Sequence, residues 1–293
     1  MSPNRLQVWF LAARPKTLWA AVAPVIVGVA MAAADGAFVF LTALAALLGA
    51  VLIQIGTNLA NDYADFKTGA DAEDRLGPMR VTQAGLVSPA QMKRAIGITF
   101  GLAVLDGLYL VAVAGWPVVV IGVLSIAFGL MYTGGPFPLG YHGLGEIFVF
   151  VFFGLVAVAG TYYVQALRLT LPVVLAGVAP GLFSVAILAV NNLRDIESDR
   201  RSGKRTLAVR YGRVFARAEY VLAVGVASLM PITLMMHRPK PIALAATICL
   251  ALAARPILHV CRSTDGPTLN GVLAATGLNL LAYSLLFALG WLL

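Results

Sequence analysis

The sequence predicts an all-α integral membrane protein, in which about nine transmembrane helices form a bundle around a central cavity. Of the 293 residues, 60% are hydrophobic and only 12% are charged, and the mean hydropathy is +0.89, which is far outside the range of soluble domains. The hydrophobic residues form continuous runs of about 20, the length at which an α-helix crosses a bilayer. Membrane-spanning strands would instead be shorter and alternate in polarity.

Nine apolar runs mark the predicted spans in order. They lie at residues 18–34, 37–57, 95–113, 117–133, 144–164, 171–193, 214–236, 240–259 and 269–292. As helices, they satisfy their own backbone hydrogen bonds, which hydrocarbon requires. The first run is as short as a signal peptide, but it follows Arg5, Arg14 and Lys16, lacks a small-residue cleavage site and precedes eight further runs. We therefore interpret it as a retained span.

Basic residues are distributed unevenly between the two sides of these spans. Of the 21 Lys and Arg residues, all but Arg168, Arg238 and Lys240 lie in the N-terminal segment or near the segments after the second, sixth and eighth runs. The positive-inside rule predicts a cytoplasmic N-terminus and an external Leu293, in the cell membrane. Topology thus explains the net charge of +8, and we expect the lipid bilayer, not nucleic acid, as the partner.

Eight of the 13 acidic residues lie in two polar segments, residues 58–94 and 191–217. Each segment directly follows an apolar run, so we interpret residues 1–293 as a single domain. The segments resemble each other, with NLANDYAD at residues 58–65 and NNLRDI at residues 191–196. Such a repeat places the ends of the second and sixth runs opposite each other across a central cavity.

Both segments carry carboxylates at helical spacing. The aligned residues are Asn58, Asp62 and Asp65 in the first segment, and Asn192, Asp195 and Asp199 in the second. Carboxylates grouped at the end of a span repel one another and are costly to desolvate, and a divalent cation removes the repulsion. Mg²⁺ is the predicted ion, because it takes hard oxygen ligands and bridges one or two carboxylates to substrate phosphates.

Basic residues accompany both sets of carboxylates. They are Lys67, Arg75 and Arg80 in the first segment, and Arg194, Lys204 and Arg205 in the second. Such cations bind phosphate oxygens that a metal does not reach. The alternative is an ordinary solvated loop, but two matching segments in a chain otherwise poor in acids favour a site for a Mg²⁺-bound diphosphate at the cytoplasmic face.

These motifs resemble those of the UbiA superfamily of intramembrane aromatic prenyltransferases, whose members have nine helices and the motifs NxxxDxxxD and DxxxD. Residues 195–199, DIESD, match the second motif. Asn61 and Asp65 match the first, but Gly69 stands in the third position and Asp71 follows two residues later. The departure leaves open whether Asp71 replaces the third member.

Four stretches are similar to the branch that prenylates 1,4-dihydroxy-2-naphthoate in menaquinone biosynthesis. They are residues 61–80, 13–18, 132–146 and 203–210. The resemblance implies that a polyprenyl diphosphate loses diphosphate, that the allylic cation is captured by the naphthoate ring with loss of CO₂, and that demethylmenaquinol results. It covers residues 9–217, whereas the last two spans agree only in hydropathy.

The resemblance and the residue patterns together give a set of candidate site residues. The catalytic candidates are Asp65, Asp195, Asp199 and Lys204. The metal ligands are Asp62, Asp65, Asp71, Asp195 and Asp199. The substrate-binding candidates are Asn58, Asn61, Lys67, Arg75, Arg80, Tyr132, Asn192, Arg194 and Arg205.

Further residues are candidates for the prenyl chain and the acceptor. Phe148, Phe150, Phe152 and Phe153 either line a tunnel for the prenyl chain or pack between helices. Tyr132, Tyr141, Lys16 and His142 are candidates for orienting the acceptor. Asp106 and Glu146 are acids near hydrocarbon, which makes both functional suspects.

Three alternative functions stay open at this point. A transporter would also have many spans and a repeat, but its polar residues would lie at the midplane. A CDP-alcohol phosphatidyltransferase also uses paired aspartates, but its Asp-Gly and Ala-Arg run is absent from this sequence. A UbiA-type enzyme with another acceptor, such as 4-hydroxybenzoate, homogentisate, haem or phosphoribosyl diphosphate, is the nearest rival.

Overall fold

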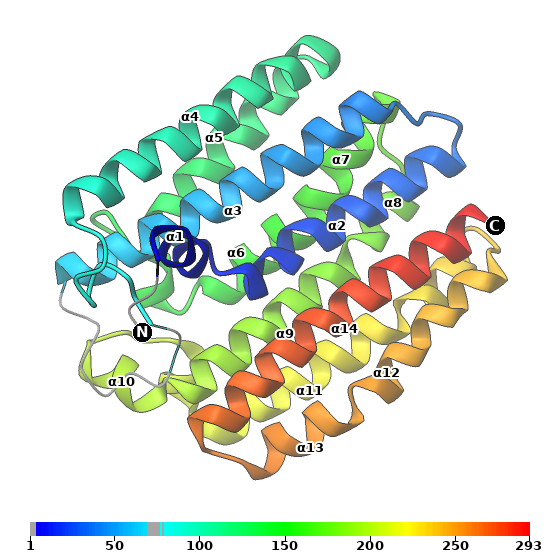
Figure 1. The fold of residues 1–293 in the computed structure, drawn as a ribbon. Helices are drawn as coiled ribbons and strands as arrows, with labels where there is room; N and C mark the ends of the chain where they lie inside the picture. Colours follow the sequence, from blue (N-terminus) through cyan, green and yellow to red (C-terminus); the bar gives the residue numbers. More distant parts are fainter. Residues whose placement is uncertain (1–3, 69–76, 78) are drawn as a thin grey trace.

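In the computed structural model, which describes residues 4–68, 77 and 79–293, the chain folds into a bundle of long helices (Figure 1). The elements are α1 (Arg5–Ala13), α2 (Pro15–Ala34), α3 (Phe40–Thr68), α4 (Pro89–Ala114), α5 (Trp116–Met131), η1 (Leu139–His142), α6 (Gly145–Phe150), η2 (Val151–Val156), α7 (Ala157–Ala166), α8 (Leu171–Ala176), α9 (Val178–Arg194), α10 (Ile196–Arg201), α11 (Leu207–Met235), η3 (Pro241–Ile248), α12 (Cys249–Leu252), α13 (Ala254–Arg262) and α14 (Gly266–Leu292). This order confirms the predicted all-α fold.

The predicted apolar runs coincide with these helices. Within the described residues, eight helical segments of 18 residues or more are apolar enough to cross a membrane, and α5 is a shorter apolar helix at the fourth predicted run. The number of about nine therefore holds only if α5 is counted. The fifth run is α6, η2 and α7 in succession, the sixth is α8 and α9, and the eighth is η3, α12 and α13.

The first described helix, α1, lies before the first predicted span. It begins with a capping box, in which the side chain of Asn4 accepts from the Gln7 amide and that of Gln7 accepts from the Asn4 amide. It ends at Arg14, whose left-handed φ of 53° turns the chain into Pro15, the first residue of α2. This turn brings the start of α2 beside the end of α3.

The fifth span changes its winding where two glycine-containing segments touch. A π-helical turn at η2 contains Gly154, and a Cβ built there would lie 2.5 Å from the Gly177 carbonyl oxygen and 2.6 Å from the Gly181 Cα. No side chain fits such an approach, so glycine is required. The contact fixes the fifth span against the sixth.

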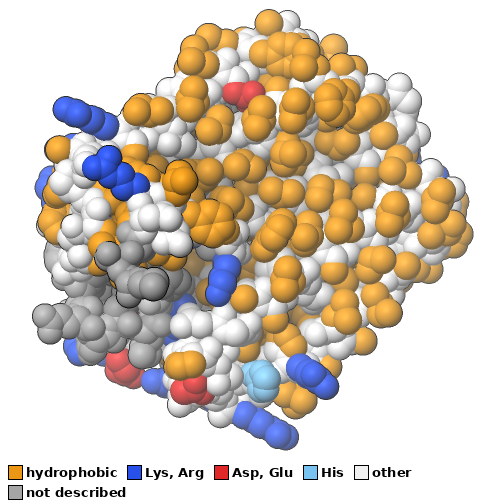
Figure 2. Space-filling view, in the orientation of Figure 1, with side chains coloured by type: hydrophobic (Ala, Val, Ile, Leu, Met, Phe, Trp, Pro, Cys, Tyr) orange, Lys and Arg blue, Asp and Glu red, His pale blue; other side chains and the backbone are white. Residues whose placement is uncertain are grey.

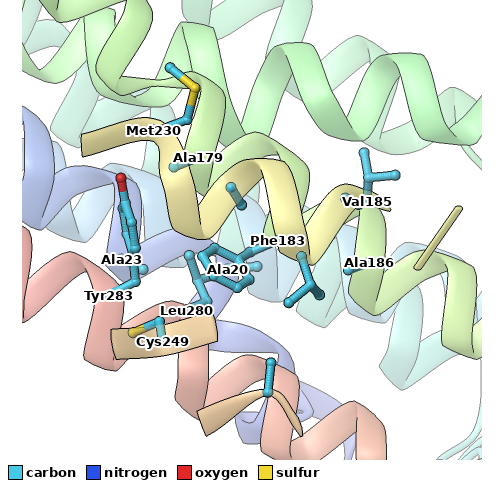
Figure 3. Packing of buried hydrophobic residues seen from close by; sticks show 14 of the residues in the cluster. Ala20, Ala23, Ala179, Phe183, Val185, Ala186, Met230, Cys249, Leu280 and Tyr283 are labelled. Atoms are coloured by element: carbon cyan, nitrogen blue, oxygen red, sulfur yellow. The ribbon is translucent and has the colours of Figure 1, made fainter. Parts of the chain in front are cut away.

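The best-packed part of the bundle lies around α9. This helix packs against α11, and α14 packs against α2. Figure 3 shows Phe183 of α9 and Tyr283 of α14 among small side chains such as Ala20 and Ala23, and the two ring centroids are 5.5 Å apart. Small residues allow close helix approach in a membrane, where apolar burial alone does not drive helices together.

The outer surface is apolar where it would face lipid. Figure 2 shows hydrophobic side chains over most of the visible face, with Lys and Arg gathered mainly toward its margins. The N-terminus and α10 lie at one end of the bundle, and the C-terminus lies at the other (Figure 1). We call the first of these the polar end, because both acidic segments reach it.

Candidate active site

The polar end brings the two acidic segments together. Lys204 Nζ lies 3.6 Å from Asp65 Oδ1 and 3.8 Å from Asp199 Oδ1. Asp65 belongs to the last turn of α3 and Asp199 to α10, so one ammonium group spans carboxylates from both segments. The side chain of Asp65 is 1% exposed, that of Asp199 11% and that of Lys204 20%. This confirms that the ends of the second and sixth predicted runs face each other.

Asp65 has a second cationic partner. The Arg80 guanidinium donates to Asp65 Oδ2, and both side chains are buried. Buried charges of this kind persist when they are paired. Arg80 therefore lies beside the same carboxylate as Lys204, where both cations also reach any phosphate bound there.

Asp62, one turn earlier, has a different role in this structure. Its Oδ2 accepts from the Val81 amide at 3.1 Å and its Oδ1 from the Thr82 amide at 3.1 Å. The residue is 2% exposed. Asp62 therefore holds the returning loop, and this loop carries Arg80 to Asp65.

Asp195 is paired with its neighbour in sequence. Arg194 donates through Nε to Asp195 Oδ1 at 2.8 Å and also to Asp195 Oδ2. The same guanidinium donates to Asn191 Oδ1 at 2.8 Å and to Asn270 Oδ1 at 2.6 Å, so α14 helps to hold it. Because the Arg194 side chain is 1% exposed, it acts as a fixed support for Asp195.

The three asparagines predicted to bind substrate join helices around the polar end. Asn58 donates to the Ala13 carbonyl oxygen at 2.9 Å, and Asn61 accepts from the Thr133 hydroxyl at 2.9 Å. Asn192 donates to Glu146 Oε1 at 2.9 Å. These bonds hold the ends of α3 and α9 against α1, the α5–η1 loop and α6.

Two connections at the polar end, the loop through η1 and the segment between α10 and α11, are fastened to each other. The Arg205 amide donates to the Tyr141 carbonyl oxygen at 2.9 Å, and the Arg210 guanidinium donates to the His142 carbonyl oxygen at 2.7 Å. Gly143 lies between them with φ +68°, and a Cβ there would lie 2.9 Å from the Arg205 carbonyl oxygen. The side chain of Arg205 points outward from this contact, since the residue is exposed.

A cavity of about 480 Å³ leads from the polar end into the bundle. Asn58, Asn61 and Tyr132 line one end, and α3 borders it from Ala46 to Asn61, which corresponds to about 22 Å of helix. Most of its other lining residues are apolar. Its shape and polarity suit a hydrocarbon chain whose polar head lies at Asp65 and Asp199.

Aromatic side chains form part of the cavity wall. Phe148, Phe152 and Phe153 line it, whereas Phe150 packs toward Gly181 of α9. The rings of Phe148 and Phe128 have centroids 4.6 Å apart. The tunnel interpretation therefore fits three of the four predicted phenylalanines, and helix packing fits Phe150.

Tyr132 lies where the cavity meets the carboxylates. A Cβ on Gly145 would come within 2.9 Å of the Tyr132 hydroxyl, and one on Gly140 would come within 3.3 Å of its ring. Its charged neighbours are Glu146, Asp199 and Asp65. The two glycines thus make room for a phenol that faces both the apolar cavity and the acids.

Two predicted residues, Asp71 and Arg75, lie outside the described part of the chain. In the part that the structure does describe, no three acidic, histidine or cysteine side chains converge as a metal site, since the aspartates contact cations and amides instead. Asp65 and Asp199 nevertheless offer hard oxygens on either side of one cation, the donor chemistry that a magnesium ion takes.

Sequence reasoning missed several contacts in this region. The Glu146–Asn192 bond and the Thr133–Asn61 bond each join residues far apart in the chain, and no spacing rule reveals them. Lys67 lines a separate cavity with Lys93. The sequence signals for Glu146 were its position as an acid at the start of an apolar run and its place in the family-like stretch at residues 132–146, and neither pointed to Asn192 as its partner.

Comparisons with known proteins agree with this geometry. The model of the UbiA prenyltransferase family matches residues 21–272. This chain belongs to that family. The 1,4-dihydroxy-2-naphthoate octaprenyltransferase of Escherichia coli (strain K12) is 42% identical over 98% of this chain and 96% of that protein. The protein of the same name from Mycobacterium tuberculosis (strain ATCC 25618 / H37Rv) is 41% identical over 96% and 95%.

Solved structures of UbiA homologs share the fold. One from Archaeoglobus fulgidus, bound to DMAPP and Mg²⁺, has a TM-score of 0.67 at 11% identity and covers 95% of this chain and 98% of that chain. One from Aeropyrum pernix K1, in its apo form, has a TM-score of 0.67 at 18% identity and covers 94% and 97%. This UbiA-family chain is therefore a multi-span membrane protein, and the likeness includes the last two spans.

Proposed function

We propose that this UbiA-family protein transfers a polyprenyl chain from polyprenyl diphosphate to 1,4-dihydroxy-2-naphthoate, with loss of diphosphate and CO₂, to give demethylmenaquinol. The observation that carries the proposal is the meeting of Asp65 and Asp199 near Tyr132, which lines one end of a long apolar cavity. Relatives named for this reaction are 42% and 41% identical over nearly the whole chain.

The carboxylates form the metal-binding part of the site in this proposal. Asp65 and Asp199 would hold Mg²⁺, with Asp195 and Asp71 as further ligands that the sequence predicts, whereas both oxygens of Asp62, which the sequence also predicts as a ligand, accept from loop amides. The bound ion would neutralise charge that develops on the leaving diphosphate. The protein's own side chains bind the diphosphate and enclose the prenyl chain.

Cations around the carboxylates bind the diphosphate. Arg80 and Lys204 lie beside Asp65, so both reach phosphate oxygens at that position. Arg205 is exposed at the same end, and Arg194 orients Asp195 from a buried position. These side chains, together with Arg75, supply the positive charge that favours departure of diphosphate.

The cavity holds the prenyl chain and keeps water from the allylic carbon. Its apolar walls exclude water along the chain, and Tyr132 faces the end at which the carbon–oxygen bond breaks. The face of an aromatic ring stabilises a nearby cation, so the phenol ring is suited to the developing allylic charge. The naphthoate carbon that carries the carboxylate then attacks, and the carbon–carbon bond forms.

We propose that the protein lies in the cell membrane with its polar end in the cytoplasm and its C-terminus outside. The basic residues of the acidic segments and the N-terminus support this orientation. A reporter that is active only in the cytoplasm, fused after Leu293, is expected to be inactive. Activity of that fusion would reverse the orientation.

Incubation of detergent-solubilised protein with a polyprenyl diphosphate, 1,4-dihydroxy-2-naphthoate and Mg²⁺ tests the function. The expected product by mass spectrometry is a decarboxylated prenyl-naphthoquinol, absent with EDTA and absent when 4-hydroxybenzoate replaces the naphthoate. Prenylation of 4-hydroxybenzoate alone would move the protein to another branch of the family.

A further inference from the structure

A second cavity, of about 580 Å³, lies beside the first at the polar end. Its walls are the last turns of α3, the first turns of α4 and the loop between α5 and η1. Tyr63 and Lys67 come from α3, Lys93 from α4, and Thr133 and Tyr141 from the loop. Unlike the apolar cavity, it therefore combines aromatic rings with two cations.

The side chains of this cavity suit an anionic aromatic molecule. Lys93 Nζ lies 5.4 Å from the centroid of the Tyr63 ring, and Lys204 Nζ lies 5.2 Å from that of the Tyr141 ring. Each ring thus has an ammonium group beside its face. The Tyr141 hydroxyl is buried and has no hydrogen-bond partner within the described residues. A buried hydroxyl of this kind is satisfied when a ligand bonds to it.

Only a thin partition separates the two cavities. The Thr133 hydroxyl, which lines the second cavity, donates to Asn61 Oδ1, and Asn61 lines the first. Tyr141 is close to the reacting end as well, because the Lys204 above its ring contacts Asp65 and Asp199. A molecule in the second cavity therefore lies next to the place where the prenyl diphosphate would react.

We propose that this second cavity binds the aromatic hydroxy-carboxylate acceptor, with its carboxylate at Lys93 and Lys67, its ring beside Tyr63 and a hydroxyl at Tyr141. The assignment rests on the proposed function for the identity of the acceptor. Arg80 and Lys204 form ion pairs with Asp65, whereas Lys67 and Lys93 line the second cavity. Donor and acceptor thus have separate cations, which keeps the carboxylate away from the diphosphate site.

Equilibrium binding of 1,4-dihydroxy-2-naphthoate to the full-length protein in detergent, without prenyl diphosphate or Mg²⁺, tests the assignment. In a calorimetric titration, Lys93→Gln is expected to raise the Kd about threefold to tenfold, as expected for loss of one charge-assisted contact. Lys93→Arg should stay near wild type. Arg94→Gln, the matched control, removes the adjacent charge, which does not line the cavity, and should leave the Kd unchanged.

A ligand that lacks the carboxylate distinguishes the contribution of Lys93 to binding from that of Tyr141. For 1,4-dihydroxynaphthalene, Lys93→Gln should leave the Kd unchanged, whereas Tyr141→Phe should weaken binding of both ligands. If wild type prenylates the naphthoate but Lys93→Gln binds it as wild type does, the assignment is overturned and the proposed function stands. If wild type prenylates no naphthoate, the proposed function itself fails.

An anionic lipid headgroup offers the same charge to these lysines, so the titration is repeated in phosphatidylcholine nanodiscs with and without phosphatidylglycerol. The expected Kd for the naphthoate is the same in both. Competition by phosphatidylglycerol in wild type that disappears in Lys93→Gln would assign the cavity to lipid and overturn the proposal.

Discussion

Asp65 and Asp199 lie on either side of the Lys204 ammonium group, at 3.6 and 3.8 Å, although they come from opposite halves of the chain. One cation thus joins the two acidic segments. The arrangement explains how carboxylates that would repel each other stay together at the end of a membrane bundle. It also makes Lys204 the side chain whose loss affects both segments at once.

Lys204→Gln is expected to raise the KM for prenyl diphosphate about tenfold, the effect of losing roughly 1.4 kcal/mol of charge-assisted binding. Lys204→Arg should recover part of the loss. Arg200→Gln serves as the control, since Arg200 is exposed and pairs with Glu197 at 3.0 Å instead. Equal effects of the two glutamine variants in steady-state kinetics would contradict a specific role for Lys204.

Asp62 is expected to act through the loop that it holds. Asp62→Ala removes both acceptors of the Val81 and Thr82 amides and should cost about 1–3 kcal/mol of stability, whereas Asp62→Asn retains one acceptor and should cost less. Thermal unfolding in detergent measures the difference. Unchanged unfolding of both variants together with lost turnover would show that Asp62 serves mainly as a metal ligand.

Gly145→Ala should disturb Tyr132, because the added Cβ would come within 2.9 Å of the phenol hydroxyl and 3.2 Å of Leu188. The expected result is a fall in kcat of about tenfold, or about 1.4 kcal/mol in the barrier, with the fold retained. Gly122→Ala is the matched control, since Gly122 also lines the apolar cavity and nothing lies within 4 Å of its added Cβ. A kcat equal in the two variants would mean that the position of Tyr132 does not matter.

Asp35 lies at the end of the bundle opposite the site, between α2 and α3. Burial opposes its ionisation, but hydrogen bonds from Tyr162 and Arg238 and the charges of Arg238 and Arg168 outweigh burial and hold the pKa of Asp35 below its usual value. A lowered folded-state pKa adds stability above the unfolded pKa and loses it as the pH falls through the folded pKa.

Asp35→Asn should therefore lower the Tm at pH 7 by roughly 2–4 °C, the shift that corresponds to about 1 kcal/mol in a large domain. The gap to wild type should close as the pH falls below about 4, near the ordinary pKa of an aspartate. Melting curves of both proteins across this range measure it. A gap that stays constant with pH would exclude the ion pairs as its cause.

Much of the fold follows from the sequence because hydrocarbon permits few alternatives. The nine apolar runs were sufficient to locate the eight long apolar helical segments and the shorter α5 of the described residues, since each run must satisfy its own backbone hydrogen bonds. The changes of helical winding within a span could not be predicted from the sequence. The π-helical turn at η2 lies where Gly154 meets Gly177, and a contact between two separate segments leaves no local pattern in the sequence.

The candidate site was likewise predicted only in part from the sequence. Helical spacing brought out Asp65 and Asp199, and the repeat indicated that their segments face each other, which the structure bears out. From their helical spacing alone, Asp62 and Asp65 were both predicted to be metal ligands. In the structure Asp62 binds loop amides and Asp65 binds cations, because the loop after α3 folds back onto this face.

The central claim is that Asp65 and Asp199 together hold the metal that binds the diphosphate. The most direct test is the Kd of a polyprenyl diphosphate with Mg²⁺ and with EDTA, in wild type, Asp199→Asn and Glu197→Gln, whose carboxylate lies on the same helix but is 61% exposed. The account predicts that Mg²⁺ tightens binding in wild type and in Glu197→Gln, and that Asp199→Asn loses this gain. A gain of equal size in all three proteins would contradict it.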